Sequence, residues 1–226
     1  MRIEITHPLQ EFKGGDHSSA VFMDRDGIIN ELVYYPEHAV VDSPFTVEQF
    51  RLTPFAAQAV NRFHDLGYKV IVISNQPGMA KGHFNESTFD LIRIRMRDML
   101  KKENANLDGE YYCFHHPNGI REEYKGVCDC RKPKPGLILR AAKDQGIRLS
   151  ESFFIGDGLV DMKAGRAASC TTILVASANA FLIKLMKDQD SEPDYLVRTL
   201  GEAVSIVENH KTARRQHHPR NVSEGR

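Results

Sequence analysis

The sequence predicts an α/β fold, a Rossmann-like three-layer sandwich around a mainly parallel sheet. Short, apolar, β-branched runs alternate along the chain with amphipathic helical stretches, which is the pattern of parallel strands connected by helices. Polar residues that can carry chemistry come directly after three of these runs, as they do at the carboxyl edge of such a sheet. The length of 226 residues suits one domain with a sizeable core.

Five segments are predicted to be strands of this sheet. The clearest is Val70–Ile73, which is apolar and β-branched without alternation and is therefore typical of a strand buried on both faces. The other predicted strands share its apolar character: Ala20–Met23, Tyr111–Phe114, Phe153–Ile155 and Thr171–Val175.

Five helical stretches lie between or after these strands. The first has Thr53 as its N-cap, Pro54 in its first turn and Gly67 as its C-terminal stop. The second presents apolar residues from Phe89 to Met99 on one face. The remaining three predicted helices are one that begins after Pro135 and ends at Gly146, one over Ala180–Met186, and one over Thr199–Glu208.

A polar, basic and aperiodic segment follows the last predicted helix. We therefore predict one domain over residues 1–209 and a disordered tail over 210–226, with an anion-binding arm as the alternative for the tail.

Composition narrows the class of protein. Thirty basic and thirty acidic residues cancel, so no net field attracts nucleic acid or anionic lipid. No uncharged apolar run reaches the roughly 18 residues that a membrane span needs, and the first twenty residues lack the apolar stretch of a signal peptide. We therefore expect a cytoplasmic protein that is monomeric by default, with neither a membrane nor a nucleic acid as its partner.

Acidic and polar side chains follow three of the predicted strands. Asp24 and Asp26 come after the first strand, Ser74 and Asn75 after the second, and Asp157 after the strand at residues 153–155. Each alone is more typical of a turn or a helix cap, but the carboxyl ends of parallel strands bring them to one edge. Two unit charges about 4 Å apart repel by roughly 4 kcal/mol at an effective dielectric constant of 20. Clustered carboxylates therefore call for a cation, and Mg²⁺ is the expected one.

A magnesium ion beside carboxylates indicates phosphoryl transfer. An extended segment places Asp24 and Asp26 on one side, roughly 6–7 Å apart. One carboxylate can then attack phosphorus while the other handles the proton on the leaving oxygen. Ser74 can hydrogen-bond a phosphate oxygen, and Lys132, which leads into a predicted helix, is the candidate for a phosphate-binding cation.

A second cluster has the residue types of a zinc site. Cys113, His115, Cys128 and Cys130 form a Cys-x-His and a Cys-x-Cys pair, and a Cys₃His set suits tetrahedral Zn²⁺. Four protein ligands leave no open position, so the predicted zinc is structural, orders the loop at 118–127, and orients the cations that follow Cys130. His116 is the alternative to His115 as ligand, and reduced cysteines without metal are the alternative to zinc.

Five segments together resemble the haloacid-dehalogenase-like phosphatases, in the zinc-containing branch that holds D-glycero-D-manno-heptose 1,7-bisphosphate phosphatase and histidinol-phosphate phosphatase. The segments span residues 21 to 175 and are Asp24-Arg-Asp-Gly-Ile-Ile-Asn30, Ser74-Asn-Gln-Pro-Gly78, Cys113-Phe-His-His-Pro117, Cys128-Asp-Cys-Arg-Lys-Pro-Lys-Pro-Gly136 and Gly156-Asp-Gly-Leu-Val-Asp161.

The resemblance implies a role for each matching residue. Asp24 would be the nucleophile that forms an aspartyl-phosphate, and Asp26 the general acid and base. Ser74 and Lys132 would hold the phosphate, while Asn75 and Arg131 would contact substrate. Magnesium would be held by Asp24, the Asp26 carbonyl and Asp157, and zinc by Cys113, His115, Cys128 and Cys130.

Two positions depart from the pattern of these relatives. Ile28 stands where the commonest motif has threonine, and Gly158 stands where the heptose enzymes usually carry lysine. One charge-assisted hydrogen bond fewer should weaken phosphate binding by roughly 1.5–3 kcal/mol unless another group replaces it.

The interval from Glu31 to Ile73 has room for one helix and a loop, too little for a separate cap domain. We expect its segment from Tyr34 to Phe45, with the zinc loop, to wall an open cleft. The predicted function is a Mg²⁺-dependent phosphomonoesterase that acts on a heptose bisphosphate. Hydrolysis of histidinol phosphate, of another sugar phosphate or of a nucleic-acid 3′-phosphate is the enzymatic alternative, and a non-catalytic zinc module that binds protein or nucleic acid is the alternative from another class.

Overall fold

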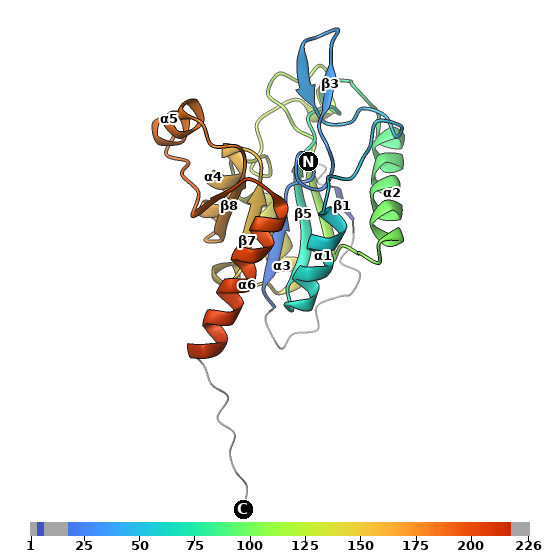
Figure 1. The fold of residues 1–226 in the computed structure, drawn as a ribbon. Coiled ribbons are helices and arrows are strands. Elements are labelled where there is room, and N and C mark those ends of the chain that lie inside the picture. Colours follow the sequence, from blue (N-terminus) through green and yellow to red (C-terminus); the bar gives the residue numbers. More distant parts are fainter. Residues whose placement is uncertain (1–3, 7–17, 218–226) are drawn as a thin grey trace, which may run out of the picture.

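Seven strands form one sheet in the computed structural model of the chain, which describes residues 4–6 and 18–217 (Figure 1). Their order is β1-β6-β5-β2-β7-β8-β9, and β1 alone among them runs antiparallel to its neighbour. The strands are β1 (Glu4–Thr6), β2 (Ala20–Met23), β5 (Lys69–Asn75), β6 (Gly109–Cys113), β7 (Phe153–Gly156), β8 (Thr171–Val175) and β9 (Tyr195–Val197). A separate antiparallel hairpin consists of β3 (Val33–Tyr35) and β4 (Val40–Asp42).

Helices cover both faces of this sheet, which confirms the predicted three-layer α/β sandwich. In the central strand β2, Val21 and Met23 pack into one apolar cluster, while Ala20 and Phe22 pack into the other. The alternation buries the strand on both faces, as its uninterrupted apolar sequence predicts. The first cluster includes residues of α1 (Ala56–Asp65), α2 (Glu86–Lys102) and α6 (Leu200–His217), and the second those of α3 (Gly136–Gln145), α4 (Leu159–Ala167) and α5 (Ala180–Asp188).

The five predicted strands correspond to β2, β5, β6, β7 and β8, and the five predicted helices to α1, α2, α3, α5 and α6. The end of α3 is where Gly146 adopts the left-handed conformation (φ 62°), in agreement with its predicted stop. Helix α4, the three-residue strands β1, β3, β4 and β9, and the 3₁₀ turns Glu122–Tyr124 and Leu149–Glu151 were not predicted.

The predicted N-cap of the first helix is wrong. Helix α1 begins at Ala56, after Phe55 in the left-handed region (φ 71°), and it has no side-chain cap. The Thr53 hydroxyl instead donates to the carbonyl of Ile28. Thr53 is therefore occupied in tying the approach to α1 to the loop that follows β2.

The predicted disorder from His210 onward is wrong for the described part of that segment, because α6 continues to His217. Side chains from this stretch contact the body of the domain: Tyr195 Oη lies 2.7 Å from His210 Nε2, and Lys211 Nζ lies 4.9 Å from the centre of the Tyr68 ring. These contacts give the last turns a packed face that composition does not reveal. Residues 218–226, the rest of the predicted tail, lie outside the described residues.

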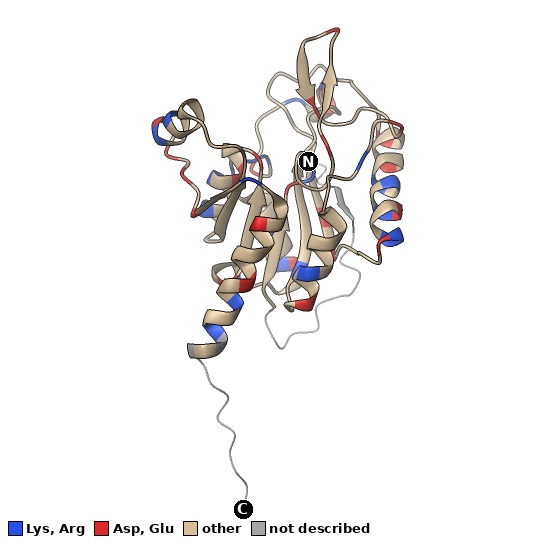
Figure 2. Ribbon diagram, viewed as in Figure 1, with Lys and Arg blue, Asp and Glu red and all other residues tan. Residues whose placement is uncertain are grey.

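Charges of both signs are interspersed over the helices (Figure 2), α2 being a clear example. This distribution agrees with the zero formal charge and offers no extended basic face along α2 for a nucleic acid. Over the described ranges, 4–6 and 18–217, no helix combines the length and the apolar character that crossing a membrane requires.

Candidate active site

Three neighbouring strands deliver the predicted site residues to one edge of the sheet. Strands β5, β2 and β7 are adjacent and parallel, so their carboxyl ends coincide. Ser74 and Asn75 end β5, Asp24 follows β2, and Asp157 follows β7. The Asp24 backbone N–H donates to the carbonyl of Ile155 over 2.9 Å, which extends the β2–β7 pairing to the first residue of the site.

Lys132 lies at the centre of the acidic cluster. Its Nζ is 3.0 Å from Asp24 Oδ2 and 2.6 Å from Asp161 Oδ1, and it donates to the Ile73 carbonyl over 3.0 Å. Carboxylate oxygens of Asp24, Asp157 and Asp161 all lie within 4.8 Å of one another. The predicted set did not include Asp161, although it lies in the same matched segment as Asp157, four residues later and in the first turn of α4.

The charges in this cluster favour a cation. Burial raises the pKa of Asp24 to about 8, an effect that Lys132 opposes and the neighbouring carboxylates reinforce. Burial and repulsion by Asp161 raise the pKa of Asp157 to about 7. Burial alone would lower the pKa of Lys132, but Asp161 and Asp24 raise it. One ammonium among three carboxylates leaves excess negative charge, and an oxygen donor set of this kind fits Mg²⁺.

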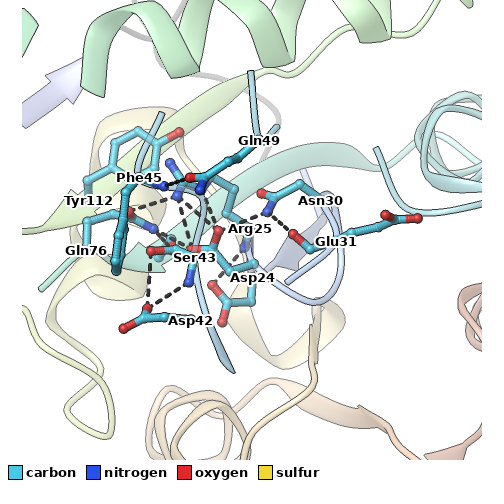
Figure 3. Close-up of polar contacts among 12 residues, drawn as sticks. Asp24, Arg25, Asn30, Glu31, Asp42, Ser43, Phe45, Gln49, Gln76 and Tyr112 are labelled. Atoms are coloured by element: carbon cyan, nitrogen blue, oxygen red, sulfur yellow. Dashed lines mark hydrogen bonds and ion pairs between the residues drawn. The ribbon is translucent and has the colours of Figure 1, made fainter. Parts of the chain in front are cut away.

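Asp26 is held by a second group of side chains, which are labelled in Figure 3: Arg25 and Asn30 from the loop after β2, and Gln76 directly after β5. Buried Arg25 donates to both carboxylate oxygens, from Nη2 over 3.0 and 3.2 Å. Gln76 Nε2 donates to Asp26 Oδ2 over 2.6 Å, and Asn30 Nδ2 donates to Oδ1 over 3.0 Å. None of these three residues was among the predicted site residues. Their charge-assisted hydrogen bonds fix the direction of the Asp26 carboxylate.

Ser74 and Asn75 are placed differently from one another. The buried Ser74 hydroxyl accepts from Gln76 Nε2 over 3.0 Å and so joins the group around Asp26. The Asn75 amide forms a reciprocal pair with the Lys132 backbone, accepting from its N–H at 3.0 Å and donating to its carbonyl at 3.1 Å. Asn75 therefore positions the segment that carries Lys132, and it also borders the cavity above the acidic cluster.

A cavity of about 240 Å³ opens over these groups. The end of the β3–β4 hairpin lines it, as expected, whereas the zinc loop does not form the second wall that was predicted: the lining contains Arg131, directly after Cys130, and no residue of 113–130. Residues 24–68 are all described, and beyond α1 and this hairpin they contain no further domain. The lining residues are Asp24, Asp26, Leu32, Val41, Asp42, Ser43, Asn75, Pro77, Arg131 and Asp157.

The four predicted zinc ligands come together beside β6. The three sulfur atoms are 3.2, 3.2 and 3.6 Å apart, and His115 Nδ1 lies 3.4 Å from Cys130 Sγ. A tetrahedral site with Zn–S bonds of about 2.3 Å has edges of about 3.8 Å, so a small outward shift of the sulfur atoms makes room for Zn²⁺, and the donor types fit it. The cluster contains His115, whereas His116 Nδ1 accepts from the backbone of Asn118. The loop has a further anchor in buried Tyr124, whose hydroxyl donates to Glu86.

Replacement of Gly27 by alanine is expected to lower kcat/KM at least tenfold. Gly27 has φ +81°, and a Cβ there would lie 2.0 Å from Asp157 Oδ2, so the Asp157 carboxylate must leave its position in the acidic cluster. The matched control is Gly67→Ala, which has φ +80° but open space around the added Cβ. Both variants should unfold more easily by about 1–2 kcal/mol, but Gly67→Ala should keep its activity. Equal specific activity of the two folded variants would contradict the prediction.

The comparisons with known proteins agree with this geometry. A family profile described as HAD-hydrolase-like matches residues 129–203. The D-glycero-β-D-manno-heptose-1,7-bisphosphate 7-phosphatase of Salmonella typhi is 33% identical over 189 residues, covering 83% of this chain and 94% of the relative. The enzyme of the same name from Pasteurella multocida is 32% identical, covering 85% and 98%.

Solved structures share the fold. A candidate HAD-like phosphatase from Mesorhizobium loti is 28% identical with a TM-score of 0.70, covering 90% of this chain and 97% of that one. The D,D-heptose 1,7-bisphosphate phosphatase of B. bronchiseptica, solved with magnesium and phosphate, is 24% identical with a TM-score of 0.68, covering 85% and 99%. The extent of the sequence identity confirms the resemblance: the chain belongs to the haloacid-dehalogenase-like hydrolases, in the group that contains the heptose-bisphosphate phosphatases.

Proposed function

We propose that this protein is a Mg²⁺-dependent phosphomonoesterase that removes the 7-phosphate from D-glycero-β-D-manno-heptose 1,7-bisphosphate through an aspartyl-phosphate. The observation that carries the chemistry is the junction of Asp24, Asp157, Asp161 and Lys132 beneath one cavity. The 32–33% identity to enzymes of that name over more than four fifths of the chain supports the choice of substrate.

Asp24 is the nucleophile in this proposal. Its Oδ1 accepts from the Arg25 N–H over 2.7 Å, and its Oδ2 lies against Lys132, so both oxygens have fixed positions below the cavity. Attack forms an Asp24 oxygen–phosphorus bond and breaks the bond from phosphorus to the ester oxygen. Lys132 and Ser74 hold phosphate oxygens, while Asn75 and Arg131 contact the remainder of the substrate.

Asp26 transfers the protons. In the first step its carboxylic acid gives a proton to the departing oxygen, and in the second its carboxylate takes one from the water that cleaves the aspartyl-phosphate. Arg25, Gln76 and Asn30 hold this carboxyl group at the cavity in both steps. The cycle returns Asp24 and Asp26 to their starting states and releases an alcohol and inorganic phosphate.

Two metal ions belong to the proposal. Asp24, Asp157 and the Asp26 carbonyl would hold Mg²⁺, with Asp161 as an additional carboxylate of the cluster. When bound, this ion reduces the repulsion between carboxylate and phosphate and stabilises charge on the transferring group. Cys113, His115, Cys128 and Cys130 would hold a structural Zn²⁺. Because Cys130 directly precedes Arg131 and Lys132, this ion would orient both basic side chains.

A panel of phosphomonoesters tests the function. We expect the highest kcat/KM on the heptose bisphosphate and at least about 100-fold slower phosphate release after Mg²⁺ is chelated, because the carboxylates then repel the substrate. Histidinol phosphate, hexose monophosphates and a 3′-phosphorylated oligonucleotide serve as the competing substrates. Faster turnover of one of these would replace the substrate assignment, and metal-independent turnover would contradict the mechanism.

A further inference from the structure

We propose that Asp42, at the end of the β3–β4 hairpin, is a specificity-determining residue that accepts hydrogen bonds from hydroxyl groups of the substrate's leaving group. The proposal rests on the phosphatase function above. It concerns the part of the substrate that departs as the alcohol, which the acidic cluster at the sheet edge does not contact.

The hairpin brings Asp42 to the same cavity as the reacting groups. Asp42 lines the space that Asp24 and Asp157 border from below, together with Val41 from the same hairpin and Leu32 directly before it. Figure 3 labels Asp42 and Ser43 near Asp24, and all three line the same cavity. A leaving group larger than the phosphate must extend into this space. There it meets two apolar side chains, which suit its carbon atoms, and one carboxylate.

The base of the hairpin holds this carboxylate rigidly. Asp42 Oδ1 accepts from the Ser43 N–H over 2.7 Å, and the Ser43 carbonyl accepts from the Tyr35 hydroxyl over 3.0 Å. Gln49 Oε1 lies 2.9 Å from the same hydroxyl oxygen, and the Phe45 ring stacks on Tyr35 with ring centres 4.3 Å apart. A hydrogen-bond acceptor whose direction is already set loses little freedom when substrate binds, so it contributes more to affinity.

The charges around the cavity indicate toward which residue each part of the leaving group lies. Among the described residues that line the cavity, Arg131 is the one basic side chain, and it comes from the segment after the zinc loop. Gly158 provides no cation next to Asp157. Asp42 makes the hairpin wall acidic, which attracts hydroxyl donors and repels a phosphate group. A second phosphate on the leaving group therefore lies toward Arg131, and the hydroxyl groups lie toward Asp42.

The test compares two substrates in one variant. For Asp42→Ala we expect KM for the heptose bisphosphate to rise about 10- to 100-fold, the range for loss of a charge-assisted hydrogen bond, with kcat changed less than threefold. The leaving group of p-nitrophenyl phosphate has no alcohol hydroxyl chain, so the ratio of the two kcat/KM values should fall by nearly the same factor. Glu37→Ala is the matched control, because Glu37 is an exposed acid of the hairpin tip outside the cavity lining.

Asp42→Asn guards against a folding defect, since asparagine can still accept from the Ser43 N–H. It should give a smaller rise in KM in the same direction. If kcat/KM falls equally for both substrates, so that the ratio of the two values does not change, the proposal is overturned. If the wild type prefers another polyol phosphate, the same ratio measured with that substrate decides the role of Asp42 even though the heptose assignment has failed. Binding of that phosphate to Asp24→Asn, with and without Asp42→Ala, gives the same comparison without turnover.

Discussion

Asp24→Asn is expected to lower phosphate release by at least about 10³-fold on every substrate that the wild type hydrolyses, because an amide cannot form the acyl phosphate.

The folded state of Asp24→Asn should be no less stable than that of the wild type. Burial and neighbouring carboxylates raise the pKa of Asp24 to about 8, so its favourable contribution in the metal-free protein exists below pH 4 and is lost as the pH rises toward 8. Asparagine is neutral at every pH and avoids this loss of stability at pH 7.5. The metal-free variant should therefore melt at or above the wild-type temperature.

Trapping of the phosphorylated enzyme tests whether Asp24 is the nucleophile. Acid-quenched wild type should carry acid-stable, hydroxylamine-labile phosphate during turnover, and the variant should carry none. The control is Asp65→Asn, which removes an exposed carboxylate at the end of α1 and should retain full activity. Turnover by Asp24→Asn within tenfold of wild type would exclude Asp24 from the role.

Cys130→Ser is expected to release zinc, to loosen the loop, and to lower kcat/KM at least tenfold. Cys130 is the ligand closest to Arg131 and Lys132, so loss of its bond frees the segment that carries both cations. Hydrogen exchange should become faster over Asn118–Lys132. Tyr124, which donates to Glu86, should keep the middle of the loop attached, and the largest change should therefore fall between Cys128 and Lys132.

The matched variant is Cys170→Ser. Cys170 is also a buried free cysteine, but it lies outside the four-residue cluster. Both variants place a hydroxyl in the interior, and only Cys130→Ser should lower the measured zinc content from one equivalent. Unchanged hydrogen exchange in the loop after verified loss of zinc would show that the metal does not order it.

The accuracy of the predicted elements followed the strength of their apolar patterns. Strand β5 is buried over residues 70–74 and is unmistakable in sequence. The hairpin strands β3 and β4 contain three residues each and are largely exposed, so their pattern carries little information about burial. The same holds for the last turns of α6, where contacts of His210 and Lys211 with distant rings, and not local periodicity, extend the helix.

The site residues likewise fall into those that the sequence predicted and those that it did not. The strand-end rule predicted Asp24, Ser74 and Asp157, because a parallel sheet leaves little choice about where such residues meet. It could not predict that Arg25 and Gln76 turn inward to hold Asp26, since an arginine in a loop is far more often exposed. Nor could it predict Asp42, whose place depends on how a short hairpin folds back over the sheet.

The amino-acid sequence by itself determined the class of fold, the acidic sheet edge and the cluster of three cysteines and one histidine, because backbone pairing and side-chain chemistry depend on residue type and spacing. The tertiary structure alone decided which two carboxylates Lys132 joins, which side chains fix Asp26, and which wall of the cavity is acidic. Those outcomes depend on the directions of side chains from segments far apart in the chain, and packing in three dimensions sets such directions.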